Sequence, residues 1–76
     1  MPKLFPTDWR NQLKIFENFG CTYVRKKGSH HVLKYSGAKR AVVIPEYDEI
    51  DLDIIKSNMR TVGMSRKKYF ALLEEI

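Results

Sequence analysis

The feature that most constrains this chain's fold is a run of three β-type segments whose connections are too short to hold a helix. Residues 22–27 and 30–35 are rich in β-branched and aromatic side chains, and residues 27–29 form the turn between them. A third segment, residues 39–44, follows after a short connection at 36–38. Parallel strands need a crossover of about a dozen residues or more, so we predict an antiparallel three-stranded meander.

A helix is predicted before these strands. It begins after an N-cap at Thr7 or Asp8 and ends at Gly20, where glycine adopts a left-handed conformation at little cost. Its apolar positions define one face, which we expect in the core: Trp9, Leu13 and Phe16. Pro45 ends the third strand, because proline cannot donate to a sheet ladder.

Two more helices are predicted after the strands. Asp51 caps the first of them, which ends at Gly63 and has its apolar face at Leu52, Ile55, Met59 and Val62. Ser65 caps the next, with a hydrophobic staple and apolar face at Met64, Tyr69, Phe70, Leu73 and Ile76. The predicted class is α+β in the order α-β-β-β-α, with the last helix broken at Gly63 and helices packed on one face of the sheet.

Length and composition predict one small domain over residues 1–76. A chain of 76 residues buries one modest core, and a hydrophobic content of 43% excludes a disordered chain. No apolar run approaches the roughly 20 residues that span a bilayer, and residues 1–6 lack the features of a signal peptide. Cys21 is the only cysteine, so we expect it to be buried, without a disulfide or zinc role, in a cytoplasmic protein.

Charge is distributed unevenly along the chain. Residues 1–45 have nine Lys and Arg against Asp8 and Glu17, a balance of +7. Residues 46–55 have five carboxylates and no base, and residues 56–76 return to +3. The carboxylates precede and begin a predicted helix, where they suit its dipole, and they lack the glycine of a calcium loop. The basic part is where a polyanion would dock.

The most informative segment is the hairpin turn, which reads Lys26-Lys27-Gly28-Ser29-His30-His31 and follows Arg25. Metal-free RNA cleavage needs a group that removes the 2′-OH proton, a group that protonates the leaving oxygen, and cations that balance the phosphorane charge. Histidine suits proton transfer near neutral pH. A structural reading stays open, because His30 and His31 point to opposite faces of a strand and one of them can be half buried.

Segments in one register over residues 9–73 carry a family resemblance: Phe19-Gly20, Arg25, Lys27-Gly28-Ser29-His30, Val32-Leu33-Lys34-Tyr35, Val42-Val43-Ile44-Pro45, Arg60-Thr61-Val62-Gly63-Met64-Ser65 and Tyr69-Phe70-Ala71-Leu72-Leu73. Together they resemble the HicA family of mRNA interferase toxins. The resemblance implies a fold like that of double-stranded RNA-binding domains. It also implies ribosome-independent mRNA cleavage in a type II toxin–antitoxin system, and a HicB antitoxin partner. We expect no cofactor, no metal ligand and no membrane partner.

Taken position by position, the resemblance implies that His30, directly after Gly-Ser, is the general acid or base. The supporting residues that it implies shape the turn or hold phosphates: Arg25, Lys26, Lys27, Gly28 and Ser29. Position 31 varies in the family, so His31 receives no role. Many relatives have histidine at position 47, whereas this chain has Tyr47, which does not exchange protons readily at neutral pH. This departure predicts a slower enzyme if position 47 assists catalysis.

Two other functions stay open. The first is a non-catalytic or weakly active RNA-binding domain, which would share the fold and the basic surface. Only His30 distinguishes it from the RNA-cleaving toxin, because binding alone does not need a histidine there. The second is a toxin that still pairs with its antitoxin but has lost catalysis, and Tyr47 supports this alternative.

Overall fold

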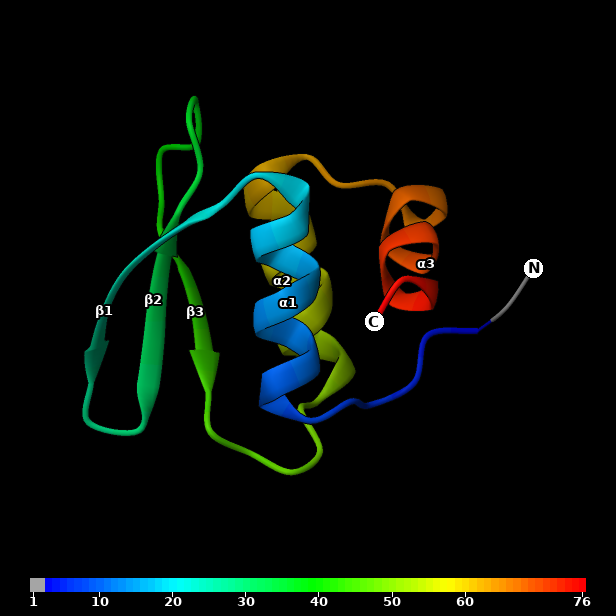
Figure 1. The fold of residues 1–76 in the computed structure, drawn as a ribbon, viewed down its shortest axis with the longest axis horizontal. Helices are drawn as coiled ribbons and strands as arrows, with labels where there is room; N and C mark the ends of the chain where they lie inside the picture. Colours follow the sequence, from blue (N-terminus) through cyan, green and yellow to red (C-terminus); the bar gives the residue numbers. More distant parts are fainter. Residues whose placement is uncertain (1–2) are drawn as a thin grey trace.

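The computed structural model describes residues 3–76, in which one helix is followed by three strands and two further helices (Figure 1). The elements are α1 (Trp9–Phe19), β1 (Thr22–Lys27), β2 (His30–Lys34), β3 (Val42–Pro45), α2 (Leu52–Val62) and α3 (Arg66–Glu74). The predicted order is confirmed, and Gly63 separates α2 from α3. The prediction that residues 1–6 contain no signal peptide falls partly on Met1 and Pro2, which lie outside the described residues.

The strands form an antiparallel sheet in the order β1-β2-β3, as the short connections predict. β2 ends at Lys34, one residue early, because the chain then turns at Gly37, whose φ of 88° is left-handed. β3 begins at Val42 rather than at residue 39, since the β2–β3 ladder ends at the pair Leu33–Val42. It continues through Pro45, which is tolerated because β3 is an edge strand.

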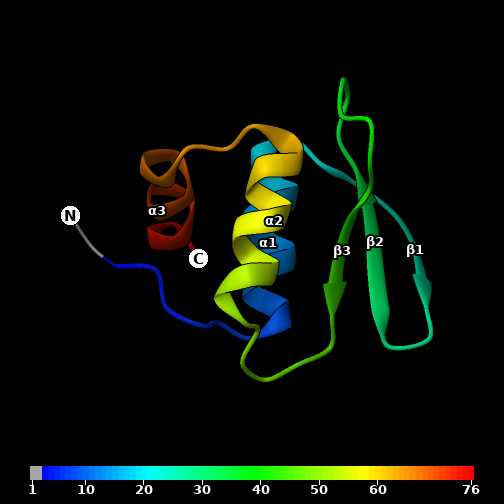
Figure 2. The ribbon, with the colours of Figure 1, turned by 180° about the vertical axis from the view of Figure 1, so that it is seen from behind.

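Helices cover one face of the sheet and leave the other face open. α1 and α2 both pack against β3, and α3 lies on the far side of them from the sheet and contacts α1 (Figures 1 and 2). His31 and Leu33 of β2 are buried on the covered face, and the residues between and beside them are more exposed. Their β3 partners, Ile44 and Val42, are buried as well. The strand register therefore fixes which face each side chain occupies.

The predicted helix N-caps are occupied. Asp8 Oδ1 accepts a hydrogen bond from the Asn11 N–H at 2.9 Å, and Ser65 Oγ accepts one from the Lys68 N–H at 3.1 Å. These bonds satisfy N–H groups that a helix start leaves without a partner. Asp51 occupies the N-cap of α2 without a side-chain hydrogen bond, so its carboxylate acts there only through the helix dipole.

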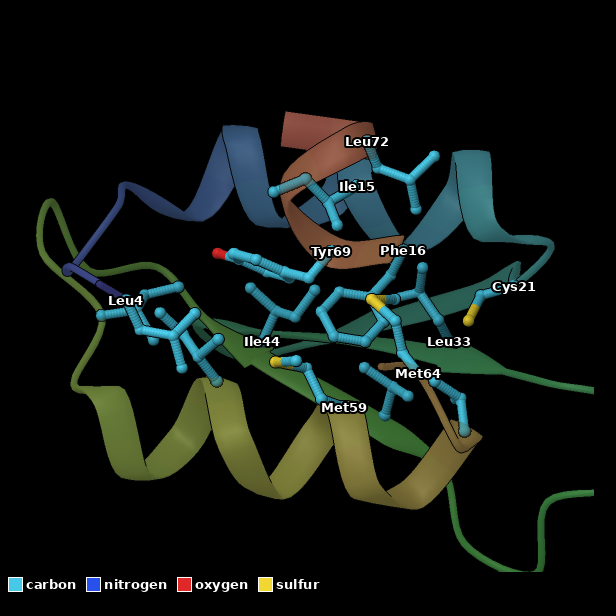
Figure 3. Packing of buried hydrophobic residues seen from close by; sticks show 14 residues of the cluster. Leu4, Ile15, Phe16, Cys21, Leu33, Ile44, Met59, Met64, Tyr69 and Leu72 are labelled. Carbon is cyan, nitrogen blue, oxygen red and sulfur yellow. The ribbon is translucent and has the colours of Figure 1, made fainter. Parts of the chain in front are cut away.

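The core lies between the helices and the covered face of the sheet (Figure 3). Its largest fully buried apolar side chains include Tyr69, Phe16, Ile15, Leu33, Ile44 and Ile55. Cys21 is buried as predicted, and burial raises the pKa of its thiol. One predicted core position is wrong, because Ile76 lies beyond the end of α3 and is 41% exposed. Five of the other predicted positions are only partly buried and pack against the core: Trp9, Leu13, Leu52, Phe70 and Leu73.

A buried polar residue, Gln12, connects α1 to α3. Its Nε2 donates to Thr7 Oγ1 at 2.6 Å and to Tyr69 Oη at 2.7 Å. Burial raises the pKa of Tyr69, so its hydroxyl stays protonated at neutral pH. Apolar periodicity did not predict this position, because glutamine is usually exposed.

Candidate functional site

The β1–β2 hairpin places its two adjacent histidines on opposite faces of the sheet, as strand alternation predicts. His30 is exposed, and its partners across the strands are Lys27 and Pro45. His31 is only 6% exposed on the covered face, and its partners across the strands are Lys26 and Ile44. The two imidazoles therefore have different surroundings.

Both ring nitrogens of His31 form hydrogen bonds. Nδ1 lies 2.8 Å from the hydroxyl oxygen of Tyr23, and Nε2 lies 2.8 Å from Oε2 of Glu46. An ionised carboxylate can only accept, so Nε2 carries a proton and donates it to Glu46. In the neutral ring, Nδ1 then accepts a hydrogen bond from the Tyr23 hydroxyl. The carboxylate therefore fixes the tautomer of His31.

Glu46 connects His31 to a lysine. Its Oε2 atom also lies 3.4 Å from Nζ of Lys26. The hydrogen bond from His31 lowers the pKa of the Glu46 carboxyl, partial burial opposes this, and the hydrogen bond and charge of Lys26 add to the lowering. The carboxylate is therefore ionised at neutral pH. The Glu46 backbone N–H donates to the Ser29 carbonyl at 2.8 Å, which fixes the end of β3 to the hairpin turn.

Trp9 covers one face of the His31 ring. The two rings are stacked, with 4.7 Å between their centroids and 9° between their planes. Arg10 lies over the Trp9 ring, with its guanidinium carbon 4.7 Å from the ring centroid. The Trp9 backbone N–H donates to the Tyr47 carbonyl at 3.1 Å, so the start of α1 is held beside the loop that follows β3.

The three cations of the hairpin are divided between the two faces of the sheet. Lys26 pairs across the strands with His31, and its side chain reaches Glu46 near the covered face. Arg25 and Lys27 pair with Val32 and His30, respectively, on the open face. The structure thus brings the predicted phosphate-binding residues together on one exposed strand, but not onto one surface.

The turn residues have the conformations that a tight hairpin needs. Gly28 has a φ of 60°, and nothing lies within 4 Å of the position that a Cβ would occupy. A side chain at this position would be opposed by backbone strain and not by crowding. Tyr47, which the resemblance aligns with a histidine of many relatives, is 51% exposed.

Sequence reasoning missed Tyr23 and Glu46 as members of the site, and assigned Glu46 to the helix dipole. The meander could have identified Glu46, because the residue that follows the third strand lies beside the first hairpin turn. Tyr23 is harder to place, since the ladder register shifts between Tyr23 and Arg25 and no sequence signal marks that shift.

Residues 3–76 enclose no pocket, and the cluster around the buried His31 reaches solvent through Lys26 and Glu46. Over the same range, no three His, Cys, Asp or Glu side chains gather closely enough to hold a metal ion. None of the helices in the described part of the chain has the length and apolarity needed to cross a membrane.

A family model described as "HicA toxin of bacterial toxin-antitoxin" matches residues 9–64, a range that contains α1, the whole sheet and α2. The fold and this match define a toxin of a bacterial toxin–antitoxin system. The chain belongs to the HicA toxin family. No curated protein and no solved structure matches it.

Proposed function

We propose that this toxin cleaves RNA by moving protons through a histidine of the β1–β2 hairpin, without a metal ion or cofactor. The observation that carries the proposal is the connected set Tyr23, His31, Glu46 and Lys26. An imidazole oriented by a carboxylate, beside an exposed ammonium group, has the parts needed for acid–base chemistry at a phosphodiester. Membership of the HicA family and the balance of +7 over residues 1–45 support an RNA substrate.

The proposed reaction is attack by the RNA on its own backbone. The imidazole takes the 2′-OH proton while the 2′ oxygen forms a bond to the adjacent phosphorus. The bond from phosphorus to the 5′ oxygen breaks, and that oxygen takes a proton from water. The resulting hydroxide then takes the proton from the imidazolium. The products are a 2′,3′-cyclic phosphate and a 5′-OH end, and the ammonium group of Lys26 balances charge on the phosphorane.

Each face of the hairpin offers one imidazole for this role. His30, which the family resemblance selects, is exposed beside Lys27 and remains a proposed catalytic residue. His31 is the better oriented group, because Glu46 and Tyr23 hold its ring, although a substrate must displace one of these partners to contact a ring nitrogen directly. We propose His31 as the first candidate and His30 as the second, and single substitutions distinguish them.

The partner of such a toxin is an antitoxin. We propose a HicB-like protein that covers the hairpin in the cytoplasm and thereby prevents RNA from docking. Direct occlusion requires no conformational change in the toxin, and an exposed β1 with three cations is accessible to an acidic partner surface.

The test is incubation of purified toxin with RNA in excess EDTA, followed by analysis of the new ends. Cyclic phosphate ends, absent when the 2′-OH at the cleavage site is replaced by hydrogen, support the proposal. The second candidate function is a non-catalytic RNA-binding domain, which the 6% exposure of His31 favours. RNA binding without cleavage under the same conditions would identify that function instead.

A further inference from the structure

Two donor groups of the hairpin converge on a single oxygen atom. His31 Nε2 lies 2.8 Å from Oε2 of Glu46, and Lys26 Nζ lies 3.4 Å from the same atom. An imidazole N–H and an ammonium group are typical phosphate ligands, and both form stronger hydrogen bonds to an anionic oxygen than to a neutral one. The point on which they converge is therefore a site for an anionic oxygen, which the protein's own carboxylate fills.

This point can be reached from solvent. The side chain of Lys26 is 50% exposed and that of Glu46 is 24% exposed, whereas that of His31 is only 8% exposed. A ligand would therefore approach along Lys26 and meet the Glu46 carboxylate before it reached the imidazole.

The Glu46 carboxylate can leave without any movement of the strand. Its backbone N–H is held by the Ser29 carbonyl at 2.8 Å, so the main chain is fixed and only side-chain torsions need to change. The carboxylate is ionised at neutral pH, so an incoming anion must compete with it for both donors.

We propose that Lys26 and His31 form a binding site for one phosphate group of RNA, and that Glu46 occupies this site in the free protein as an internal competitor. This inference rests on the proposed function in one respect, which is that the ligand is RNA. The competition itself concerns any phosphate, and it can be measured without cleavage.

The decisive variant is Glu46→Gln, because glutamine can still accept a hydrogen bond from His31 while it carries no charge. Its matched control is Glu49→Gln, which removes the same charge from an exposed position in the same loop. No ion pair joins Glu49 to the hairpin within residues 3–76. If the loss of one negative charge alone strengthened RNA binding, the affinity would rise equally in both variants.

Binding is measured with a fully 2′-O-methylated RNA oligonucleotide, which has no free 2′-OH and cannot be cleaved, and separately with inorganic phosphate. Trp9 is the only tryptophan and stacks on His31, so its fluorescence reports on the site. We expect Glu46→Gln to bind both ligands about threefold to fivefold more tightly than Glu49→Gln does, the upper part of the range for removal of one partly exposed ion pair. Adding Lys26→Ala to Glu46→Gln should abolish the gain.

Equal affinities of the two glutamine variants would overturn the proposal, because the effect would then be one of net charge. Weaker binding by Glu46→Gln than by wild type would also overturn it, since Glu46 would then be holding Lys26 in place for the ligand. Failure of the proposed function looks different. In that case the Glu46→Gln gain is present, but the wild-type toxin leaves unmodified RNA intact.

Discussion

The indole of Trp9 lies flat against the imidazole of His31, with 4.7 Å between ring centroids and 9° between ring planes. Trp9 is the first residue of α1, whereas His31 is the second residue of β2 and lies on its covered face. One contact therefore contributes both to the packing of helix on sheet and to the orientation of the candidate catalytic ring. Substitutions that disturb it should affect stability and activity together.

Substitution of the two histidines should separate the two faces of the hairpin. We expect His31→Gln to lower the cleavage rate about 10²-fold to 10⁴-fold, the usual contribution of a general acid or base. His30→Ala should stay within about tenfold of wild type. Cleavage is measured with purified proteins whose thermal unfolding confirms that they fold. The opposite pattern would assign the role to His30, as the family resemblance implies.

Replacing Trp9 by leucine should destabilise the protein by about 1–3 kcal/mol, because a stacked aromatic pair and a partly buried ring are lost together. The control is Phe5→Leu, since Phe5 is 52% exposed and its substitution should cost less than about 0.5 kcal/mol. Urea unfolding measures both. Equal stabilities of the two variants would mean that the stack contributes nothing to the fold.

Glu46 should contribute to stability in a defined pH range. Its pKa is lowered in the folded protein, first by the hydrogen bond from His31, so the folded state binds the proton less readily than the unfolded chain. The contribution is fully present above the ordinary glutamate pKa near 4.3, and it is lost as the pH falls through the lower folded value. Thermal unfolding of Glu46→Gln should therefore depend less on pH below about 5 than that of wild type, whereas Glu49→Gln should follow wild type.

The two hairpin lysines should contribute equally to the salt dependence of RNA binding but unequally to the cleavage rate. Each of Lys26→Ala and Lys27→Ala should reduce the slope of log affinity against log salt by about 0.7 for single-stranded RNA, and the double variant by about 1.4. Only Lys26 reaches the Glu46–His31 pair, so Lys26→Ala should reduce the cleavage rate more than Lys27→Ala does. If Lys27→Ala has the larger effect on cleavage, the active face is the one that carries His30.

A HicB-like antitoxin should compete with RNA for the hairpin. The measurement is binding of RNA to an inactive toxin variant while antitoxin is added, and we expect complete displacement at saturation. A ternary complex of toxin, antitoxin and RNA would exclude direct occlusion and indicate inhibition at a distance from the hairpin.

Local signals in the sequence predicted most of the fold. Asp8 and Ser65 lie at the helix starts that their capping preferences indicate, and the short turn after Lys27 determines the antiparallel pairing. The site was harder to predict, because its contacts join residues that are distant in the sequence. Glu46 is 15 residues from His31, and their contact depends on the β2–β3 register. Gln12 and Tyr69 are 57 residues apart, and no local pattern relates them.

The position of β1 at the edge of the sheet has a consequence for solubility. All six residues of β1 are exposed, and no strand within residues 3–76 pairs with its outer edge. Such an edge is a template on which a second chain can add a strand and begin aggregation. Arg25, Lys26 and Lys27 place three like charges along it, so two copies that approach edge to edge repel each other. The cations proposed to bind RNA should therefore also oppose self-association of the free toxin, and removing them to abolish RNA binding should leave a β edge more prone to it.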